Sequence, residues 1–463
     1  MGSPTLVVEL AGRLSELFGE PVEVERTAML AGGASKESWA VDAGGRELLV
    51  RRAGGGVIHL DTLSLRDEFE VLLAARRAGV KAPEPLGYLG EVDGREAFVM
   101  ERVHGETIGR RIVKEPPRSL PLQMAEELAK IHTIPRDDLP FLPDADLFER
   151  LYAELDTVDE PHPAIELGLA WCQERLPLER TRVVTHGDFR IGNLVIDANG
   201  LVAVLDWEFA HVSDPAEDLA WPLVRAWRFG EDGRRLGGIG DVEPYLDRYA
   251  ELTGREIPLD ELYAWEVLGN CKWAIGALTQ ARRHLRGEER SVELAILGRL
   301  AAEMEYELLD LIESAPSRPR PAVAPAESSP APPPRLAHRT APSGIVLPAP
   351  SPSALQREGA AGASGSDRPT AGELAAAVRE FLEMEILPTL DDHRLRFRTL
   401  VAMNALSIVE RESPRPAAPD EADAELARRI RAGEARADDL VLIRHKVRER
   451  LLLASPRYLE RYR

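Results

Sequence analysis

The sequence predicts an α+β chain with a β-rich N-terminal lobe, a helical second lobe and a small all-α domain at the C-terminal end. Three observations lead to this prediction. Short β-type runs dominate about the first hundred residues, helical periodicity takes over from about residue 119, and a proline-rich stretch sets off the last part of the chain. The predicted units are residues 1–103, 104–314, 315–370 and 371–463.

The N-terminal lobe is predicted from strand-like runs broken by glycine-containing turns. These runs are PVEVERTAML (residues 21–30), SWAVDAG (38–44), RELLVRR (46–52) and EAFVMERV (96–103). One helix interrupts them at residues 65–79, where the final glycine suits a C-cap. Residues 1–20 predict an amphipathic helix, and they lack the basic flank of a signal peptide. Its apolar face carries Leu6, Leu10, Leu14 and Leu17.

The second lobe is predicted from helical periodicity with one β-hairpin between the helices. The hairpin spans residues 193–206 and turns at Asn199-Gly200, a pair that favours a tight two-residue turn. The main predicted helices cover residues 122–132, 164–176, 260–285 and 291–313.

A proline-rich stretch, residues 315–370, holds 13 of the 35 prolines and shows no hydrophobic periodicity. Such a composition predicts a semi-extended, disordered tether. The domain beyond it is predicted to be all-helical and shows no obvious catalytic constellation. Its helical segments cover residues 370–387, with a capping box at Thr370 and Glu373, and residues 393–412, 421–433 and 437–454.

The net charge of −20 limits the partners of this chain. The acidic excess lies within residues 1–314, because residues 371–463 are neutral. Such a body is a poor ligand for nucleic acid or for an anionic membrane, and no apolar run is long enough to span one. Cys172 and Cys271 lie far apart and outside any metal-binding pattern. They favour neither a disulfide framework nor a zinc site, and suit a cytoplasmic protein.

The motif HGDFRIGN, residues 186–193, carries the chemistry. Asn193 follows Asp188 by five positions, and the hairpin returns Asp206 to the same place. Phosphoryl transfer from ATP requires a group that orients the attacking hydroxyl and oxygen ligands for Mg²⁺ on the phosphates. We therefore interpret Asp188 as the catalytic residue, and Asn193 and Asp206 as metal ligands. Each residue alone would fit a helix cap or a turn, but their joint spacing indicates function.

Together with LDWEFAHVSDPAEDLAW, residues 205–221, this motif resembles the aminoglycoside phosphotransferase and choline kinase-like family, a branch of the protein-kinase-like fold. The resemblance covers about residues 20–310. It implies a bilobal kinase that uses ATP and Mg²⁺, with Asp188 as the base. It also implies that Asp218 braces the catalytic loop by hydrogen bonds, with simple N-capping as the alternative.

The resemblance further implies a nucleotide site in the small lobe. LAGGASKESWAV resembles the loop that covers the phosphates, with Gly32, Gly33 and Ser35 at its centre. Arg51 stands where the family has a lysine, and its neighbour Arg52 is the alternative. Because arginine stays charged and binds phosphate with two N–H groups, this replacement can retain the function.

Glu68 is the expected partner of this arginine, with a solvated surface position as the alternative. FVMERVHGETI resembles the hinge between the lobes, where backbone groups near Glu101 and Val103 would read adenine. Met100 would lie against the adenine ring, and a plain core position is the alternative.

The acceptor alcohol is not determined by family membership. Finer motifs, GGASKESW and FVMERVHGETI among them, resemble the subgroup that accompanies acyl-CoA dehydrogenases and phosphorylates 4-hydroxyacyl-CoA. Arg282, Arg283 and Arg286 end a predicted helix and would suit such an anionic acceptor, although helix-end cations are also favoured by the macrodipole. The acidic body would equally attract an aminoglycoside or another amino alcohol.

The C-terminal domain resembles a small helical domain of unassigned function that occurs with such kinases, fused or as a separate subunit. We expect it to pack on the kinase body or on a partner enzyme. The arginine at the lysine position, and the missing glycine after Asp206-Trp207, leave open a second class, a non-catalytic nucleotide-binding scaffold.

Overall fold

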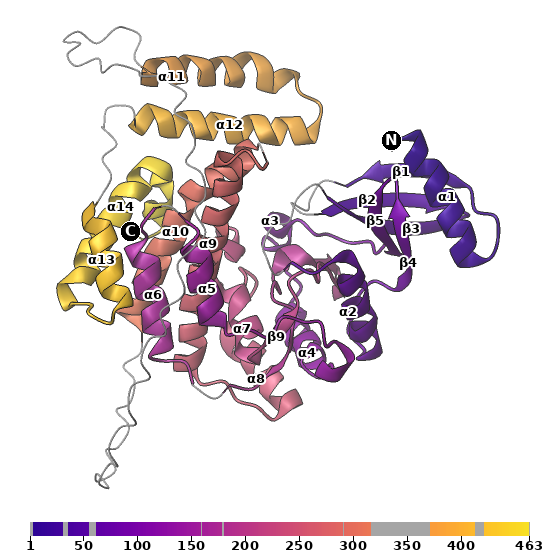
Figure 1. Ribbon diagram of the computed structural model, residues 1–463, viewed down its shortest axis with the longest axis horizontal. Coiled ribbons are helices and arrows are strands. Elements are labelled where there is room, and N and C mark those ends of the chain that lie inside the picture. The colour runs from indigo at the N-terminus through magenta and orange to yellow at the C-terminus, as the bar shows by residue number, and fades with distance from the viewer. Residues whose placement is uncertain are drawn as a thin grey trace, which may run out of the picture.

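The computed structural model describes residues 3–30, 36–54, 62–158, 160–177, 180–289, 291–315, 371–412 and 421–462. A sheet lobe and a helical lobe lie side by side, and the last two C-terminal helices lie against the helical lobe on the side away from the sheet (Figure 1). This arrangement confirms the predicted fold class.

The small lobe is a five-stranded antiparallel sheet in the order β1-β2-β3-β5-β4. Its strands are β1 (Val24–Met29), β2 (Lys36–Ala43), β3 (Arg46–Ala53), β4 (Pro85–Val92) and β5 (Arg95–Glu101). The sequence did not predict β4, which carries two glycines and begins with a proline. Such a strand is tolerated at the edge of a sheet, where β4 lies.

Two helices cover the sheet. Helix α1 (Pro4–Phe18) buries three of its four predicted leucines, whereas Leu17 is partly exposed. Helix α2 (Leu65–Arg77) begins at the side-chain cap of Ser64 and packs against β3, β4 and β5.

Side chains alternate across the sheet, and this alternation separates two neighbouring arginines of β3. Leu48 and Val50 join the apolar core beneath α1, whereas Leu49 packs against the main core on the opposite face. Arg51 lies on the same face as Leu49 and pairs with Glu68 of α2. Arg52 lies on the opposite face and pairs with Glu37 and Asp93. Of the two candidates, therefore, Arg51 faces the space between the lobes.

The helical lobe is built around two long helices, α9 and α10, which pack along one another. Its helices are α3 (Gly109–Ile112), α4 (Leu120–Ile131), α5 (Leu147–Leu155), α6 (Pro163–Gln173), α7 (Pro215–Ala220), α8 (Val242–Thr253), α9 (Leu259–Leu285) and α10 (Val292–Ser314). Within the described ranges, no helix combines the length and the apolar character that a membrane crossing demands.

Two short strand pairs position the catalytic segments. Strand β6 (Val183–Thr185) pairs with β9 (His211–Ser213), and β7 (Leu194–Asp197) pairs with β8 (Gly200–Val204). The second pair is the predicted hairpin. Because the motif HGDFRIGN connects β6 to β7, and Asp206 follows β8, the two pairs bring both segments to one place.

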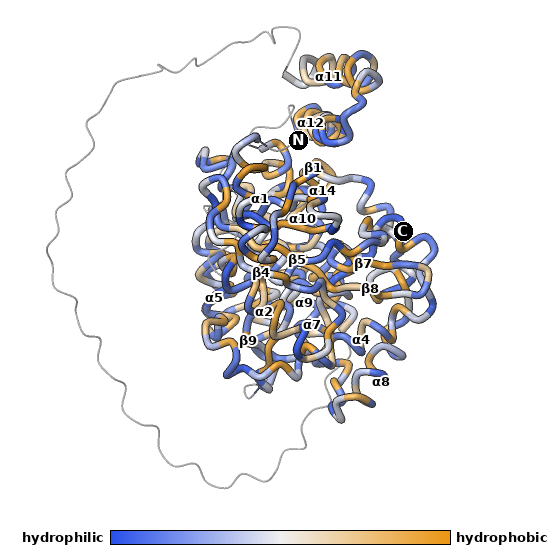
Figure 2. The backbone as a smooth tube through the Cα atoms, turned by 90° about the vertical axis from the view of Figure 1, so that its right-hand side faces the viewer, coloured by the Kyte–Doolittle hydropathy of each residue, from blue (hydrophilic) through white to orange (hydrophobic). Residues whose placement is uncertain are grey.

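The C-terminal region comprises α11 (Ala371–Phe381), α12 (His393–Glu412), α13 (Glu421–Arg431) and α14 (Ala437–Ala454). Helix α13 packs on α6 and α14 packs on α10, whereas α11 contacts mainly α12 and stands off the body (Figures 1 and 2). The capping box expected at Thr370 and Glu373 lies outside the described residues and side chains, and the tether at 315–370 lies almost wholly outside them.

Candidate active site

Asp188 lies buried at the centre of the loop between β6 and β7, with its carboxylate held on both oxygens. Its Oδ1 accepts hydrogen bonds from Trp221 Nε1 at 2.7 Å and from Arg190 Nε at 2.9 Å. Its Oδ2 accepts from Asn193 Nδ2 at 2.6 Å. A carboxylate with three donors is oriented before any substrate arrives, as a positioned base must be.

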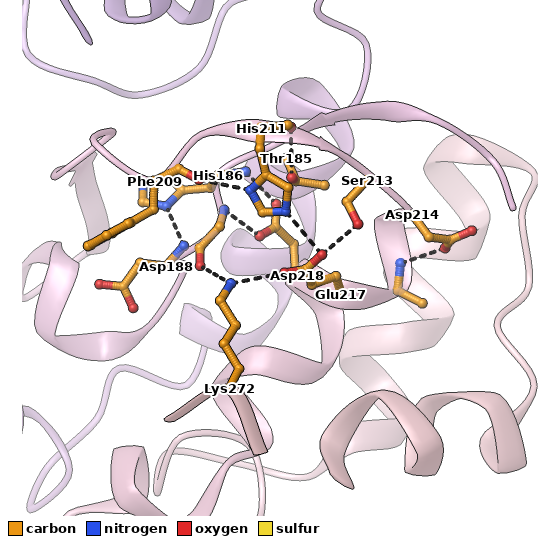
Figure 3. A network of polar contacts seen from close by, with 12 residues as sticks. Thr185, His186, Asp188, Phe209, His211, Ser213, Asp214, Glu217, Asp218 and Lys272 are labelled. Atoms are coloured by element: carbon orange, nitrogen blue, oxygen red, sulfur yellow. Dashed lines mark hydrogen bonds and ion pairs between the residues drawn. The ribbon is translucent and has the colours of Figure 1, made fainter. Parts of the chain in front are cut away.

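The catalytic loop is braced from beneath by Asp218 (Figure 3). Its two oxygens accept the backbone N–H groups of His186 and Gly187 at 2.7 and 2.9 Å. The cap of α7 is formed instead by Asp214, so bracing, and not capping, is the role that the structure gives to Asp218. Gly187 has φ +78°, and a Cβ there would lie 2.2 Å from the carbonyl oxygen of Phe209, so glycine is required.

His186 is held as a neutral ring. Its Nδ1 accepts the N–H of Asp188, so the proton lies on Nε2, which donates to the carbonyl of Leu205 at 3.0 Å. Burial lowers the pKa of His186 and outweighs the opposing effect of Asp218 and Asp188. His186 therefore acts as a structural connector between the loop and the strand end that precedes Asp206.

Lys272 of α9 reaches the same loop (Figure 3). Its Nζ donates to the carbonyl of Gly187 at 3.1 Å and pairs with Glu217 at 2.9 Å. Burial would raise the pKa of Glu217, but Lys272 and His211 outweigh it and hold that pKa well below its usual value. This network joins the catalytic loop, α7 and α9.

Asn193 and Asp206 converge as their spacing predicted. The N–H of Leu205 donates to the carbonyl of Asn193 at 2.8 Å, which places Asp206 beside the loop. The amide nitrogen of Asn193 is used by Asp188, so its amide oxygen is left for a ligand. Asp206 adopts φ +66°, a left-handed conformation that is uncommon for residues other than glycine, although aspartate takes it more readily than most.

These two side chains fit a magnesium ion. An amide oxygen and a carboxylate are hard donors, and Mg²⁺ is usually held by one or two protein oxygens together with substrate phosphates. In the described part of the chain, no three His, Cys, Asp or Glu side chains gather in a group that could hold a metal ion.

Arg51 links Asp206 to α2. Its Nη2 donates to Asp206 Oδ1 at 3.0 Å, and its Nε lies 3.1 Å from Glu68 Oε1. Glu68 is thus the buried partner that the sequence predicted, and not a surface residue. Burial would raise the pKa of Asp206, but Arg51 and then Arg190 outweigh it and lower that pKa.

Two further residues of this cluster were missed by sequence reasoning. Lys36, the first residue of β2, is buried and places Nζ 2.6 Å from Glu68 Oε2 and 3.3 Å from Glu208 Oε2. Burial and the neighbouring Asp206 raise the pKa of Glu208 to about 7. A lysine three residues after the glycine pair was the available signal for Lys36, since it begins the strand that pairs with the strand of Arg51.

The nucleotide-covering loop and the hinge are placed only in part. Gly32, Gly33 and Ser35 lie outside the described residues. Met100 is buried in the main core, the alternative that its sequence context left open. At the hinge, the N–H of Glu101 donates to the carbonyl of Glu84.

Further along the hinge, the N–H of Arg102 donates to the carbonyl of Glu47. The N–H of Val103, by contrast, makes no backbone hydrogen bond within the described ranges. Of the two predicted hinge residues, Glu101 and Val103, Val103 therefore has the backbone N–H that could donate to a ligand.

A cavity of about 430 Å³ lies beside Asp188. Three tryptophans form much of its wall, with ring centroids 5.5 Å apart for Trp221 and Trp227, and 6.5 Å apart for Trp227 and Trp273. The charged residues that line it are Arg150, Glu154, Asp188, Arg190 and Lys272. Cations thus outnumber carboxylates, even with the catalytic carboxylate included.

The arginines predicted to bind the acceptor are not among the residues that line this cavity. Arg283 contacts Gln280 and Glu289, and neither Arg282 nor Arg286 is a lining residue. The cations that do line the cavity come from α5, the catalytic loop and the middle of α9. Sequence reasoning could not find them, because they converge only through the packing of distant elements.

Residues 27–252, about half of the chain, match the model of the phosphotransferase enzyme family. This match contains β2 to β5 and the second half of β1, together with the catalytic loop and the strand pair that positions Asp206. The segment belongs to the phosphotransferase enzyme family. The phosphotransferase fold is also found in a solved structure from Ralstonia eutropha, classed as an aminoglycoside phosphotransferase. That structure is 20% identical, with a TM-score of 0.53 over 67% of this chain and 99% of that one.

Two curated relatives carry the name of another enzyme class. The chain is 25% identical over 311 residues to acyl-CoA dehydrogenase family member 10 of Mus musculus, covering 59% of this chain and 28% of the relative. It is 26% identical over 220 residues to family member 11 of Gallus gallus, covering 44% of this chain and 28% of the relative. The chain therefore spans less than a third of either relative.

Proposed function

We propose that this phosphotransferase is an ATP- and magnesium-dependent kinase that phosphorylates the hydroxyl group of a 4-hydroxyacyl-CoA. The observation that carries the choice of acceptor is the cavity beside Asp188. A flexible, apolar acyl chain is favoured by its tryptophan wall, through burial of apolar surface.

The charges of the cavity separate the candidate acceptors. A polycationic aminoglycoside requires a surplus of carboxylates around it, because buried charges need partners. This cavity instead has Arg150, Arg190 and Lys272 against Glu154 and Asp188. Both relatives are named as members of the acyl-CoA dehydrogenase family, which supports an acyl-CoA as the acceptor.

In this proposal, Asp188 orients the acceptor hydroxyl toward the γ-phosphate of ATP and accepts its proton late in the transfer. Asn193 and Asp206 hold Mg²⁺, which neutralises charge on the phosphates when bound. Arg51 and Lys36 lie on the small-lobe side of this point and bind the phosphates. Positioning and electrostatics supply most of the rate.

The remaining nucleotide contacts are part of the same proposal. The N–H of Val103 donates to adenine, and the loop with Gly32, Gly33 and Ser35 covers the phosphates. In this reading, the C-terminal helices are an accessory that packs on the kinase body.

The test is an ADP-release assay on the full chain with MgATP and 4-hydroxypentanoyl-CoA. Pentanoyl-CoA, which lacks the hydroxyl, is the matched control acceptor, and kanamycin and choline represent the amino alcohols. We expect ADP release with the hydroxyacyl-CoA alone. Asp188→Asn should lower this rate by at least about a hundredfold, the usual effect of losing a positioned base.

Two results would count against the proposal. Transfer to kanamycin or choline in place of the hydroxyacyl-CoA would assign the chain to the amino-alcohol kinases. Nucleotide binding without ADP release from any acceptor would favour a non-catalytic scaffold.

A further inference from the structure

Arg190 connects the catalytic carboxylate to the acceptor cavity. Its Nε donates to Asp188 Oδ1 at 2.9 Å, and its guanidinium carbon lies 4.3 Å from the centroid of the Trp227 ring. It also lines the cavity. A Cβ on Gly192 would lie 2.3 Å from Arg190 Nη1, so the glycine of the catalytic loop leaves the space that this guanidinium occupies.

Three other cations of the site, Lys36, Arg51 and Lys272, are paired with carboxylates other than Asp188. Lys36 and Arg51 are paired with Glu68. Lys272 is paired with Glu217 and with a backbone carbonyl of the catalytic loop. These contacts hold the three cations on groups other than the catalytic carboxylate.

Arg190 differs from them because its carboxylate partner is Asp188 itself. When an acceptor hydroxyl donates to Asp188, it competes with Arg190 for the same oxygens. Arg190 thus lies between the catalytic carboxylate and the aromatic wall of the acceptor cavity, beside the position that a transferring phosphoryl group would take.

We propose that Arg190 is a further catalytic residue, a cation that is paired with Asp188 in this structure and contacts the phosphoryl group during transfer. As the acceptor oxygen bonds to the γ-phosphorus, its proton passes to Asp188. The bond from the γ-phosphorus to the bridging oxygen breaks, and its electron pair leaves on ADP. Between these events, the charge is spread over three phosphoryl oxygens, where a guanidinium can donate two N–H groups at once.

This inference rests on the use of ATP proposed above, but not on the identity of the acceptor. Its test therefore uses ligands that need no acceptor. Mg·ADP presents the nucleotide alone, whereas Mg·ADP with aluminium fluoride mimics the transition state of phosphoryl transfer. A residue that acts on the transferring group should favour the second complex over the first.

The experiment is a calorimetric titration of the full chain with both complexes, in the wild type, Arg190→Gln and Arg190→Lys. We expect Arg190→Gln to weaken the aluminium fluoride complex at least about tenfold, a modest share of what arginines supply in phosphoryl transfer. Its affinity for Mg·ADP should change by less than about twofold. Arg190→Lys, which keeps the charge but not the paired N–H groups, should fall between the two.

Arg248→Gln is the matched control, because Arg248 pairs with Glu126 and Glu251 at the surface of α8. It should leave both affinities unchanged. Equal losses for the two complexes in Arg190→Gln, or no loss for either, would overturn the proposal. So would a wild-type chain that binds the two complexes equally. If Arg190→Gln has a lower melting temperature than the wild type, the affinities of Arg190→Lys for the two complexes are compared in the same way.

Absence of transfer to 4-hydroxypentanoyl-CoA has a separate meaning. Combined with a selective loss of the aluminium fluoride complex in Arg190→Gln, it would refute the proposed acceptor while supporting the role of Arg190.

Discussion

The indole Nε1 of Trp221 donates a hydrogen bond of 2.7 Å to Oδ1 of Asp188. Trp221 also lines the acceptor cavity, and its ring is tilted by 55° against that of Trp227. One side chain thus orients the catalytic carboxylate and forms part of the wall that the acceptor meets. A substitution of Trp221 is therefore expected to change kcat as well as the affinity for the acceptor.

Trp221→Phe should separate these two roles, because phenylalanine keeps an aromatic wall and removes the N–H donor. A hydrogen bond to a charged group is worth about 1.5–3 kcal/mol, so kcat should fall by about 10- to 100-fold. The affinity for Mg·ADP should not change. Steady-state ADP release measures the first quantity, and a fluorescence titration with a labelled nucleotide measures the second.

Trp273→Phe is the control for this change, since Trp273 lines the same cavity without a hydrogen bond to Asp188. It should affect the KM for the acceptor more than kcat. Equal losses of kcat in the two variants would contradict the orienting role of Trp221.

Asp206→Asn should raise the magnesium concentration required for half-maximal activity by at least about tenfold. An amide oxygen carries no charge, and Mg²⁺ binds best to carboxylates and phosphates. Asp197→Asn, on the exposed turn of the same hairpin, is the control. An unchanged magnesium requirement in Asp206→Asn would rule out Asp206 as a metal ligand.

Lys36→Met should raise the KM for ATP by about tenfold or more, because it removes a cation from beside Glu68 and Glu208. Arg52→Met removes a cation from the neighbouring strand, but Arg52 pairs with Glu37 and Asp93 away from the site. We expect the KM for ATP to stay within about twofold in that variant. Similar KM values in both variants would assign Lys36 a purely structural role.

The contact between α14 and α10 can be tested through stability. Glu305 is fully buried and pairs with His162 and with Arg450, which is 41% exposed. Arg450→Met should therefore lower the free energy of unfolding by about 1–3 kcal/mol at pH 7, less than a fully buried pair because of solvent screening. Denaturant titration of the full chain measures this difference.

The pH dependence of this difference has a definite sign. Burial would raise the pKa of Glu305, but Arg450 and His162 outweigh it and lower that pKa below its usual value of 4.5. A lowered pKa stabilises the folded state above the unfolded value, and this contribution is lost as the pH falls toward the folded one. The gap between wild type and Arg450→Met should thus be largest at pH 7 and shrink below about 4.5. A gap that grows with acid would contradict the pairing.

Local patterns were sufficient wherever neighbours in sequence decide the outcome. The periodicity of residues 393–412 and 437–454 predicted α12 and α14 with their observed bounds. The Asn199-Gly200 turn predicted the hairpin, and the spacing around it brought Asp188, Asn193 and Asp206 together. Their catalytic and metal-binding roles stay predictions that the variants above would test.

Packing between distant segments decided the rest. The sequence by itself determined the lobes, the catalytic loop and the hairpin, because helix period, turn chemistry and short spacings act over a few residues. Only the tertiary structure decided that Arg51 and not Arg52 faces Glu68, that Lys36 joins them, and that the acceptor cavity is lined by α5, α9 and the catalytic loop. Those outcomes depend on which faces of remote strands and helices are buried together, and no local pattern encodes that choice.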